Sequence, residues 1–190
     1  MDDALRVVFE MNASAWTGLR DALDELTEEE IRWQTVPQAN TINLIVRHLR
    51  IEAQWHLDSL ECGKPMPTLA TSPSQQAIDA VPEDFQANLK ALVLYCNRFL
   101  ELLRTTKLNT LRERTATAYG EIAQTEGRHY LLGYHHATRL AMHCGQIRSI
   151  RNLYRKTRGA PIRFFPDNPT FPHSANNPVS IEKPAGSPST

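Results

Sequence analysis

Four stretches of this chain repeat apolar side chains every three or four positions, and this spacing constrains the fold more than any other feature. Such a repeat gathers the apolar side chains on one face of an α-helix. Alternating patterns typical of strands are weak throughout the chain. The sequence therefore predicts an all-α protein whose long helices bury their apolar faces against one another. The four stretches are residues 3–26, 42–62, 83–106 and 126–157.

Cap and turn residues set the ends of these helices. Thr41 is a typical N-cap residue and begins the second long helix, and Gly63 favours the left-handed conformation that ends a helix. About twenty residues rich in Pro, Ser and Thr follow Gly63 and form a long crossover. Residues 109–124 are predicted to be irregular, with a turn at Gly120. Together these features predict an antiparallel up-down four-helix bundle with one long crossover.

The end of the chain differs in composition from the rest. After Gly159 the chain contains seven of its twelve prolines and almost no helical periodicity. We therefore expect a bundle at residues 1–157 and an extended Pro-rich tail at 158–190. The aromatic residues up to about 173 are expected to dock on the bundle, and roughly the last 15 residues are expected to be mobile.

The charge balance argues against a nucleic-acid partner, because 21 Lys and Arg residues stand against 21 Asp and Glu residues. One basic cluster near the end of the fourth helix is interpreted as a solvated helix end that the helix dipole favours. It contains Arg148, Arg151, Arg155, Lys156 and Arg158.

Hydropathy and cysteine usage predict the compartment. No apolar run approaches the roughly 20 residues that a helix needs to cross a bilayer. The chain starts without a charged-then-apolar leader, and its three cysteines are scattered and form no pair motif. We therefore expect a cytoplasmic protein without a membrane partner.

Two histidines interrupt the apolar faces of the helices, His48 on the second and His143 on the fourth. A single core histidine is more often a hydrogen-bonded residue than a ligand, but facing helices of a bundle also build metal sites in this way. Glu52 lies one turn after His48, and Arg139 lies one turn before His143. These four residues are predicted to form a polar pocket in the bundle core.

The segment from His143 to Ile147 reads His-Cys-Gly-Gln-Ile. It resembles the His-x-Gly-Gln-Ile signature that closes the last helix of DinB/YfiT-like proteins. Residues 40–49 resemble the segment of that family that ends in its first metal histidine. The resemblance covers residues 1–157 and implies a homodimeric four-helix bundle with a divalent metal held by three histidines. Characterised relatives are thiol-dependent S-transferases or isomerases, and others are described as metal-dependent hydrolases. A low-molecular-weight thiol is therefore implied as a cofactor.

The match is incomplete at one ligand. The first and last metal histidines fall on His48 and His143, but the middle one falls on Arg139. Arginine keeps its proton and offers no lone pair to a metal. The sequence therefore predicts that zinc or nickel is held weakly or not at all. Glu52 is a candidate third ligand, a residue supporting the ligands, or the partner of Arg139. We favour the ion pair, because a buried arginine needs a carboxylate.

The remaining histidines are not predicted to be ligands. His136 lies two turns before His143, about 10.5 Å along the helix axis, so joint ligation is strained. His135 is expected to point away from His143. Three others are interpreted as surface or locally hydrogen-bonded residues: His56, His129 and His173.

Three functions fit these residues. The one we favour is a small-molecule-binding DinB-like protein, related to thiol-dependent transferases or hydrolases, whose altered metal site holds an anion through Arg139. The second is an active metal-dependent S-transferase or hydrolase that uses His48, His143 and Glu52 and leaves one position open for water or thiolate. The third is a non-catalytic dimeric bundle whose polar core residues fix the packing. The sequence identifies no catalytic residue.

Overall fold

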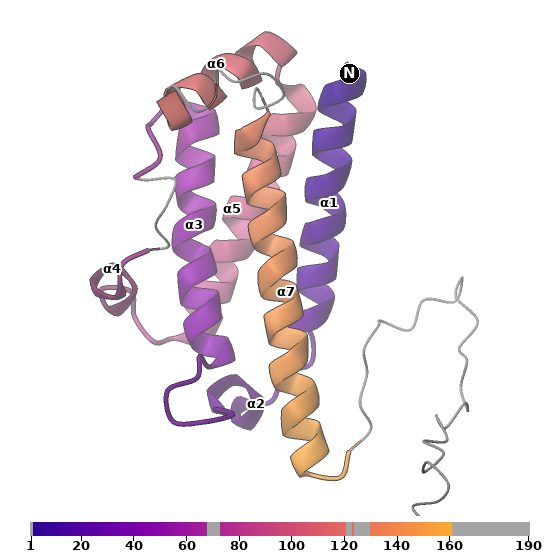
Figure 1. Ribbon diagram of the computed structural model, residues 1–190, viewed down its shortest axis with the longest axis vertical. Helices are drawn as coiled ribbons and strands as arrows, with labels where there is room; N and C mark the ends of the chain where they lie inside the picture. The colour runs from indigo at the N-terminus through magenta and orange to yellow at the C-terminus, as the bar shows by residue number, and fades with distance from the viewer. Residues whose placement is uncertain (1, 68–72, 121–122, 124–129, 161–190) are drawn as a thin grey trace, which may run out of the picture.

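The computed structural model describes residues 2–67, 73–120, 123 and 130–160 (Figure 1). These residues contain helices and no strands, which confirms the predicted all-α class. None of the described helices is long and apolar enough to cross a membrane. The helices are α1 (Asp3–Leu23), α2 (Glu28–Arg32), α3 (Ile42–Cys62), α4 (Gln75–Asp79), α5 (Phe85–Thr105), α6 (Leu108–Tyr119) and α7 (Leu131–Thr157).

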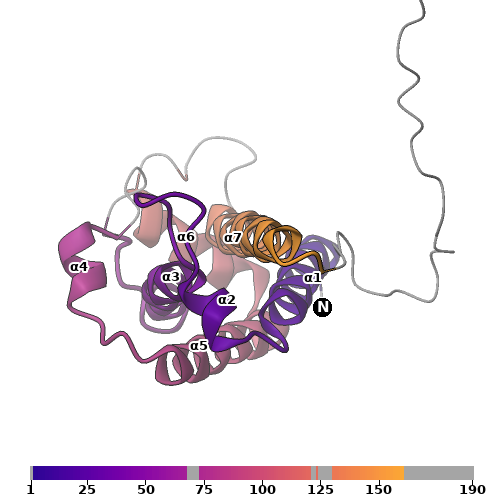
Figure 2. The same ribbon diagram turned by 90° about the horizontal axis from the view of Figure 1, so that it is seen from below.

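The four long helices α1, α3, α5 and α7 stand side by side and enclose the core (Figures 1 and 2). Helix α1 packs against α7 and α5, and α3 packs against the same two helices. Viewed from the end, α1 and α3 therefore occupy opposite corners of a square (Figure 2). Helix α6 lies across one end of the bundle and α2 lies at the other (Figure 1).

The helix directions differ from the predicted up-down order. Helices α3 and α5 are parallel, because Arg50 of α3 bonds to Asn88 near the start of α5 at 2.7 Å, and Glu61 near the end of α3 pairs with Arg98 further along α5 at 2.7 Å. Helices α1 and α7 also run in the same direction, antiparallel to α3 and α5 (Figure 1). Helix α5 therefore begins near the same end of the bundle as α3 (Figure 1). The prediction that successive long helices alternate in direction is therefore wrong for α3 and α5.

Local cap chemistry fixes the ends of α3. The Thr41 hydroxyl accepts a hydrogen bond from the Leu44 amide at 3.0 Å, and Gly63 takes the left-handed conformation with φ of 69°. Both predicted ends are confirmed. Helix α7 begins at Leu131 rather than near 126, and residues 124–129 lie outside the described part of the chain. The tail beyond residue 160 lies outside it as well, so its docking and mobility stay predictions.

Helix α6 replaces most of the segment that was predicted to be irregular. Only four of its twelve residues are buried, and most of its other side chains are polar. Its N-cap residue, Lys107, makes no side-chain cap. The apolar periodicity and the N-terminal cap that would predict a helix are therefore both weak in the sequence. Packing across the end of the bundle decides the conformation. The buried residues are Leu111, Thr115, Ala118 and Tyr119.

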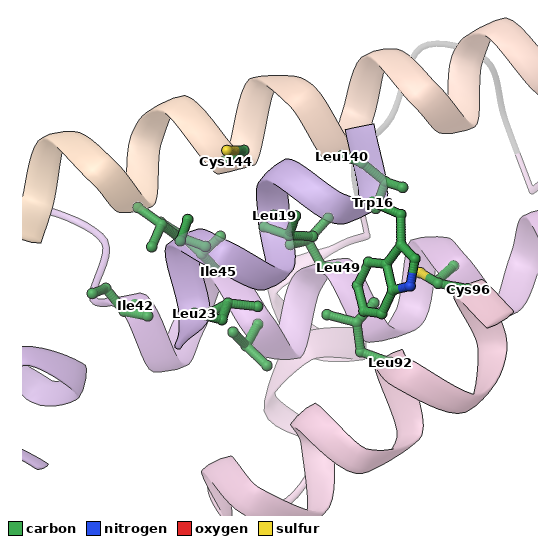
Figure 3. Close-up of a cluster of buried hydrophobic side chains, with 14 of the residues drawn as sticks. Trp16, Leu19, Leu23, Ile42, Ile45, Leu49, Leu92, Cys96, Leu140 and Cys144 are labelled. Carbon is green, nitrogen blue, oxygen red and sulfur yellow. The ribbon is translucent and has the colours of Figure 1, made fainter. Parts of the chain in front are cut away.

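The core consists of two apolar clusters. The first lies toward α2, and Figure 3 shows part of it, with Leu19, Leu49 and Leu140 among the labelled side chains. The second lies toward α6 and includes Phe99 and Leu132. On the buried faces of α3 and α7, polar residues lie among these apolar ones, including Glu52, His56, His136 and His143.

The basic cluster at the end of α7 was predicted to be a solvated helix end, which holds for the exposed Lys156 and Arg158 but not for Arg151. Arg151 is only 9 % exposed, and it pairs with Glu30 of α2 at 3.5 Å. Arg155 pairs with the same Glu30 oxygen at 3.3 Å. Glu30 is itself buried and closes the capping box that begins α2. These arginines therefore fasten α2 to the bundle.

Two glycines of α7 give a matched stability prediction. A Cβ atom on Gly145 would meet nothing within 4 Å, whereas a Cβ on Gly133 would lie 2.3 Å from Val8 Cγ1. We expect Gly145→Ala to raise the free energy of unfolding by about 0.5–1 kcal/mol, because alanine loses less backbone entropy on folding. We expect Gly133→Ala to lower it by about 1–3 kcal/mol through overpacking. Urea unfolding followed by circular dichroism measures both, and equal effects would contradict this packing of α7 on α1.

Candidate metal centre

Three buried ligand atoms converge between α3 and α7. The Glu52 Oε2 atom lies 3.2 Å from His48 Nε2 on its own helix and 3.7 Å from His143 Nε2 on α7. All three atoms lie within 4.8 Å of one another. The two imidazole rings are 4.8 Å apart between centroids. The antiparallel contact between α3 and α7 thus joins residues that are far apart in the sequence.

The spacing and chemistry of these atoms suit a divalent cation. Ligands at tetrahedral positions about 2.0–2.1 Å from zinc lie about 3.3 Å from one another. The separations from Glu52 Oε2, 3.2 and 3.7 Å, are close to that value, whereas the three ligand atoms spread over as much as 4.8 Å, so the two imidazoles would move closer together around a bound ion. Two imidazoles and one carboxylate form a ligand set found in catalytic zinc sites, where the fourth position stays open.

The same three atoms lack hydrogen-bond partners in the described structure. Glu52 is 4 % exposed and His143 is 6 % exposed, so water does not readily solvate them. A buried polar atom without a partner costs free energy and needs an explanation. A cation between the three atoms would satisfy all of them at once.

Gln146 orients one of the candidate ligands. The His143 Nδ1–H group donates to the Gln146 side-chain oxygen at 2.7 Å. Because a neutral imidazole carries one proton, its lone pair is then on Nε2, the atom nearest to Glu52. Hydrogen bonds of this kind fix the tautomer of metal-binding histidines. This contact gives a structural role to the glutamine of the His-Cys-Gly-Gln-Ile segment.

Glu52 is the negative charge at the site. Burial alone would raise the pKa of its carboxyl group. The adjacent His143 and His48 side chains and the charge of Arg139 outweigh burial, so the pKa lies well below the ordinary value of 4.5. The carboxyl group is therefore ionised at neutral pH and can bind a cation without losing a proton.

Arg139 lies beside Glu52, and the predicted ion pair is present. Its Nε atom lies 3.4 Å from Glu52 Oε1, the carboxylate oxygen that does not approach the histidines. The Nε–H group donates to His135 Nε2 at 3.1 Å. Each oxygen of Glu52 faces a different group: Oε1 faces Arg139, and Oε2 faces the two histidines, where it is positioned as the candidate third ligand. All four residues predicted to form the pocket lie together.

A second pair of histidines, which sequence analysis did not predict, lies one turn after Glu52 on α3 and two turns before His143 on α7. His56 Nδ1 donates to the Glu52 backbone carbonyl at 2.7 Å. His136 Nδ1 donates to the Asn12 side-chain oxygen at 2.8 Å, because the Asn12 amide group itself donates to two backbone carbonyls. Both remaining Nε2 atoms are buried without a partner. We call His56 and His136 the inner histidines.

Burial keeps the inner histidines neutral. It lowers the pKa of His56 to about 4 and the pKa of His136 well below 6.5. The expectation that His56 is a surface residue is wrong, although its local hydrogen bond was predicted. His136 does not belong to the group of candidate ligands, as expected. His129 and His173 lie outside the described residues.

Tyr119 of α6 is a further site residue that sequence reasoning missed. Its hydroxyl oxygen lies 2.9 Å from His135 Nδ1, which carries the proton of that ring because His135 Nε2 accepts from Arg139. Burial raises the pKa of Tyr119 well above its ordinary range, so the phenol is neutral. No motif marks this residue, because the helix that carries it was predicted to be irregular.

The comparison with known families places the chain in the DinB/YfiT-like metal-dependent superfamily, as the sequence resemblance implied. Within it, residues 9–156 match the family model MST, Mycothiol-S-transferase, so the chain belongs to the mycothiol-S-transferase family. No curated protein and no solved structure matches the chain significantly.

Proposed function

We propose that this protein is a metal-dependent S-transferase that joins a low-molecular-weight thiol, mycothiol in the family name, to an electrophilic substrate. His48, Glu52 and His143 would hold the metal. The observation that carries the proposal is the convergence of three buried, unpaired ligand atoms in a chain of this family. It favours the active enzyme over the altered, weakly binding pocket that the sequence alone favoured.

A divalent metal held by His48, Glu52 and His143 would lower the pKa of a thiol bound to it and so favour the thiolate at neutral pH. The protein residues supply the rest of the site. Glu52 offsets the positive charge, and Gln146 holds His143 in the tautomer with a free Nε2. The two apolar clusters flank the site and reduce its access to water, which strengthens the electrostatic interactions there.

Zinc titration and kinetics test the proposal together. Protein freed of metal with a chelator is titrated with zinc and with nickel by calorimetry. The loaded protein is then assayed for joining mycothiol to a chloroacetamide reagent. We expect one metal per chain and a rate well above the uncatalysed reaction. A protein that binds no metal and gives no acceleration would support the non-catalytic bundle instead.

Arg139→His is expected to strengthen zinc binding at least tenfold. The change removes a fixed positive charge near the dication, whose repulsion costs about 1 to several kcal/mol at close range. It also restores the three-histidine pattern that the family resemblance implies. Calorimetric titration of both forms gives the two dissociation constants. If wild type binds zinc tightly and the variant binds no better, the charge of Arg139 does not act on the metal position.

We also propose, from the family resemblance, that the protein is a homodimer formed through bundle helices. Light scattering in dilute solution should then give twice the chain mass of 21.6 kDa. A mass equal to one chain would contradict the proposal.

A further inference from the structure

Counted over the described residues, the charges around the candidate metal centre balance only when the metal is absent. Glu52 and Arg139 then form a neutral ion pair. A divalent cation and Arg139 together carry three positive charges, and Glu52 supplies one negative charge. The loaded site therefore has an excess of two positive charges in a largely buried position, which is costly unless anions enter with the substrates.

No other described side chain next to Arg139 supplies that negative charge. His135, which accepts the hydrogen bond from Arg139, has a lowered pKa because of burial and Arg139, and is neutral. The inner histidine His56 is neutral for the same reasons. Tyr119 keeps its proton, because burial raises its pKa. Among the described residues, Glu52 is the one carboxylate paired with Arg139.

The contacts of the Arg139 guanidinium group with described residues are made by its Nε atom. Its Nε–H group donates to His135, which bonds in turn to Tyr119. Its two terminal nitrogens make no hydrogen bond to a described residue, and its side chain is 20 % exposed. A guanidinium group that is fixed at Nε, and whose two ends bond to no residue in the described part of the chain, is suited to a carboxylate, which it binds through two parallel hydrogen bonds.

We propose that Arg139 binds a carboxylate of the electrophilic substrate beside the metal, so that the substrates of this enzyme are carboxylic acids. The inference rests on the proposed S-transferase function. A thiolate and a carboxylate would together cancel the two excess charges of the loaded site. The arginine that replaces an expected metal ligand then becomes the residue that selects the substrate.

The reaction balances without an oxidant. With an alkyl halide as the electrophile, the thiol loses its proton to solvent, the sulfur forms a bond to the electrophilic carbon, and the carbon–halogen bond breaks with release of halide. A carboxylate several bonds from that carbon does not alter its intrinsic reactivity. Its effect on the catalysed rate therefore reports on binding.

A matched pair of reagents tests the proposal. The acid 4-(chloroacetamido)butyrate and its amide, 4-(chloroacetamido)butyramide, differ only in the terminal group. Zinc-loaded wild type should prefer the acid at least tenfold in kcat/KM. Arg139→Gln should reduce the preference to about one. Arg148→Gln, a control on the same helix, should keep the wild-type preference. Equal losses for acid and amide in Arg139→Gln would overturn the proposal, since Arg139 would then only support Glu52.

A second pair of thiols identifies which reactant carries the carboxylate. N-acetylcysteine and N-acetylcysteinamide are compared with each reagent. A preference for the acidic thiol that disappears in Arg139→Gln, without any preference for the acidic electrophile, would assign Arg139 to the thiol and overturn the proposal as stated.

Equilibrium binding separates this inference from the proposed function. The unreactive analogues 4-acetamidobutyrate and 4-acetamidobutyramide are titrated into zinc-loaded protein. The acid should bind at least tenfold more tightly than the amide in wild type and equally in Arg139→Gln. This result would support the carboxylate site even if no S-transfer were detected. Equal binding of acid and amide to wild type would overturn it even if transfer were observed.

Discussion

Replacing Glu52 with glutamine is expected to weaken zinc binding at least a hundredfold and to abolish S-transfer. Glutamine keeps the shape of the side chain but removes the negative charge and a strong oxygen ligand, leaving two imidazoles and Arg139 around a dication. Calorimetric titration with zinc measures the affinity, and thermal unfolding with and without zinc gives an independent measure, since a ligand that binds only the folded protein stabilises it.

Glu61→Gln is the matched control for this prediction. Glu61 lies on the same helix but pairs with Arg98 at the surface, so its removal should leave zinc affinity unchanged. Tight zinc binding by Glu52→Gln would show that the metal is held elsewhere. It would remove the structural basis of the proposed function.

Mild acid is expected to destabilise the metal-free protein strongly, because the inner histidines must stay neutral in the core. In the unfolded chain a histidine takes up a proton near pH 6.5, but the pKa of folded His56 is about 4 and that of His136 lies well below 6.5. The unfolded state therefore binds more protons as the pH falls below 6.5, and stability falls with it. For His56 alone the loss approaches about 3 kcal/mol near pH 4.

Urea unfolding in the presence of a chelator, at pH values from 7 to 5, measures this effect. Glu52 acts in the same direction only near and below its ordinary pKa of 4.5, so the upper part of the range reports on histidines. His56→Gln should give a shallower dependence on pH, whatever its stability at pH 7. An unfolding free energy that is constant between pH 6.5 and 5 would contradict the neutral, buried state of both residues.

Local signals predicted the long helices well, and the arrangement of the helices less well. Thr41 and Gly63 fix the ends of α3 through bonds and dihedral angles of the residues themselves. The direction of α5 depends on how far the crossover travels before that helix begins, which composition does not reveal. Helix α6 depends on packing across the end of the bundle rather than on its own periodicity.

The candidate site was likewise predicted where local patterns determine it and missed where contacts between distant helices do. Periodicity placed His48 and His143 on inward faces, and the need of a buried arginine for a carboxylate predicted the pair between Arg139 and Glu52. Helical spacing alone could not show which oxygen of Glu52 faces which partner. The inner histidine His136 is held by Asn12 of α1, and His135 is held by Tyr119 of α6. Contacts between distant segments leave no pattern in a single sequence.

The ligand atoms of the candidate centre come only from α3 and α7, and His48 and His143 are 95 positions apart in the chain. A metal bound there would act as a reversible cross-link that closes one long loop containing the crossover, α5 and α6. Closing a loop of about 100 residues removes several kcal/mol of chain entropy from the unfolded state. The apo and loaded forms would then differ in lifetime as well as in chemistry, since global unfolding would require the ion to leave first or one helix to detach from it. The supply of metal in the cell would thus set how long each copy of the protein persists.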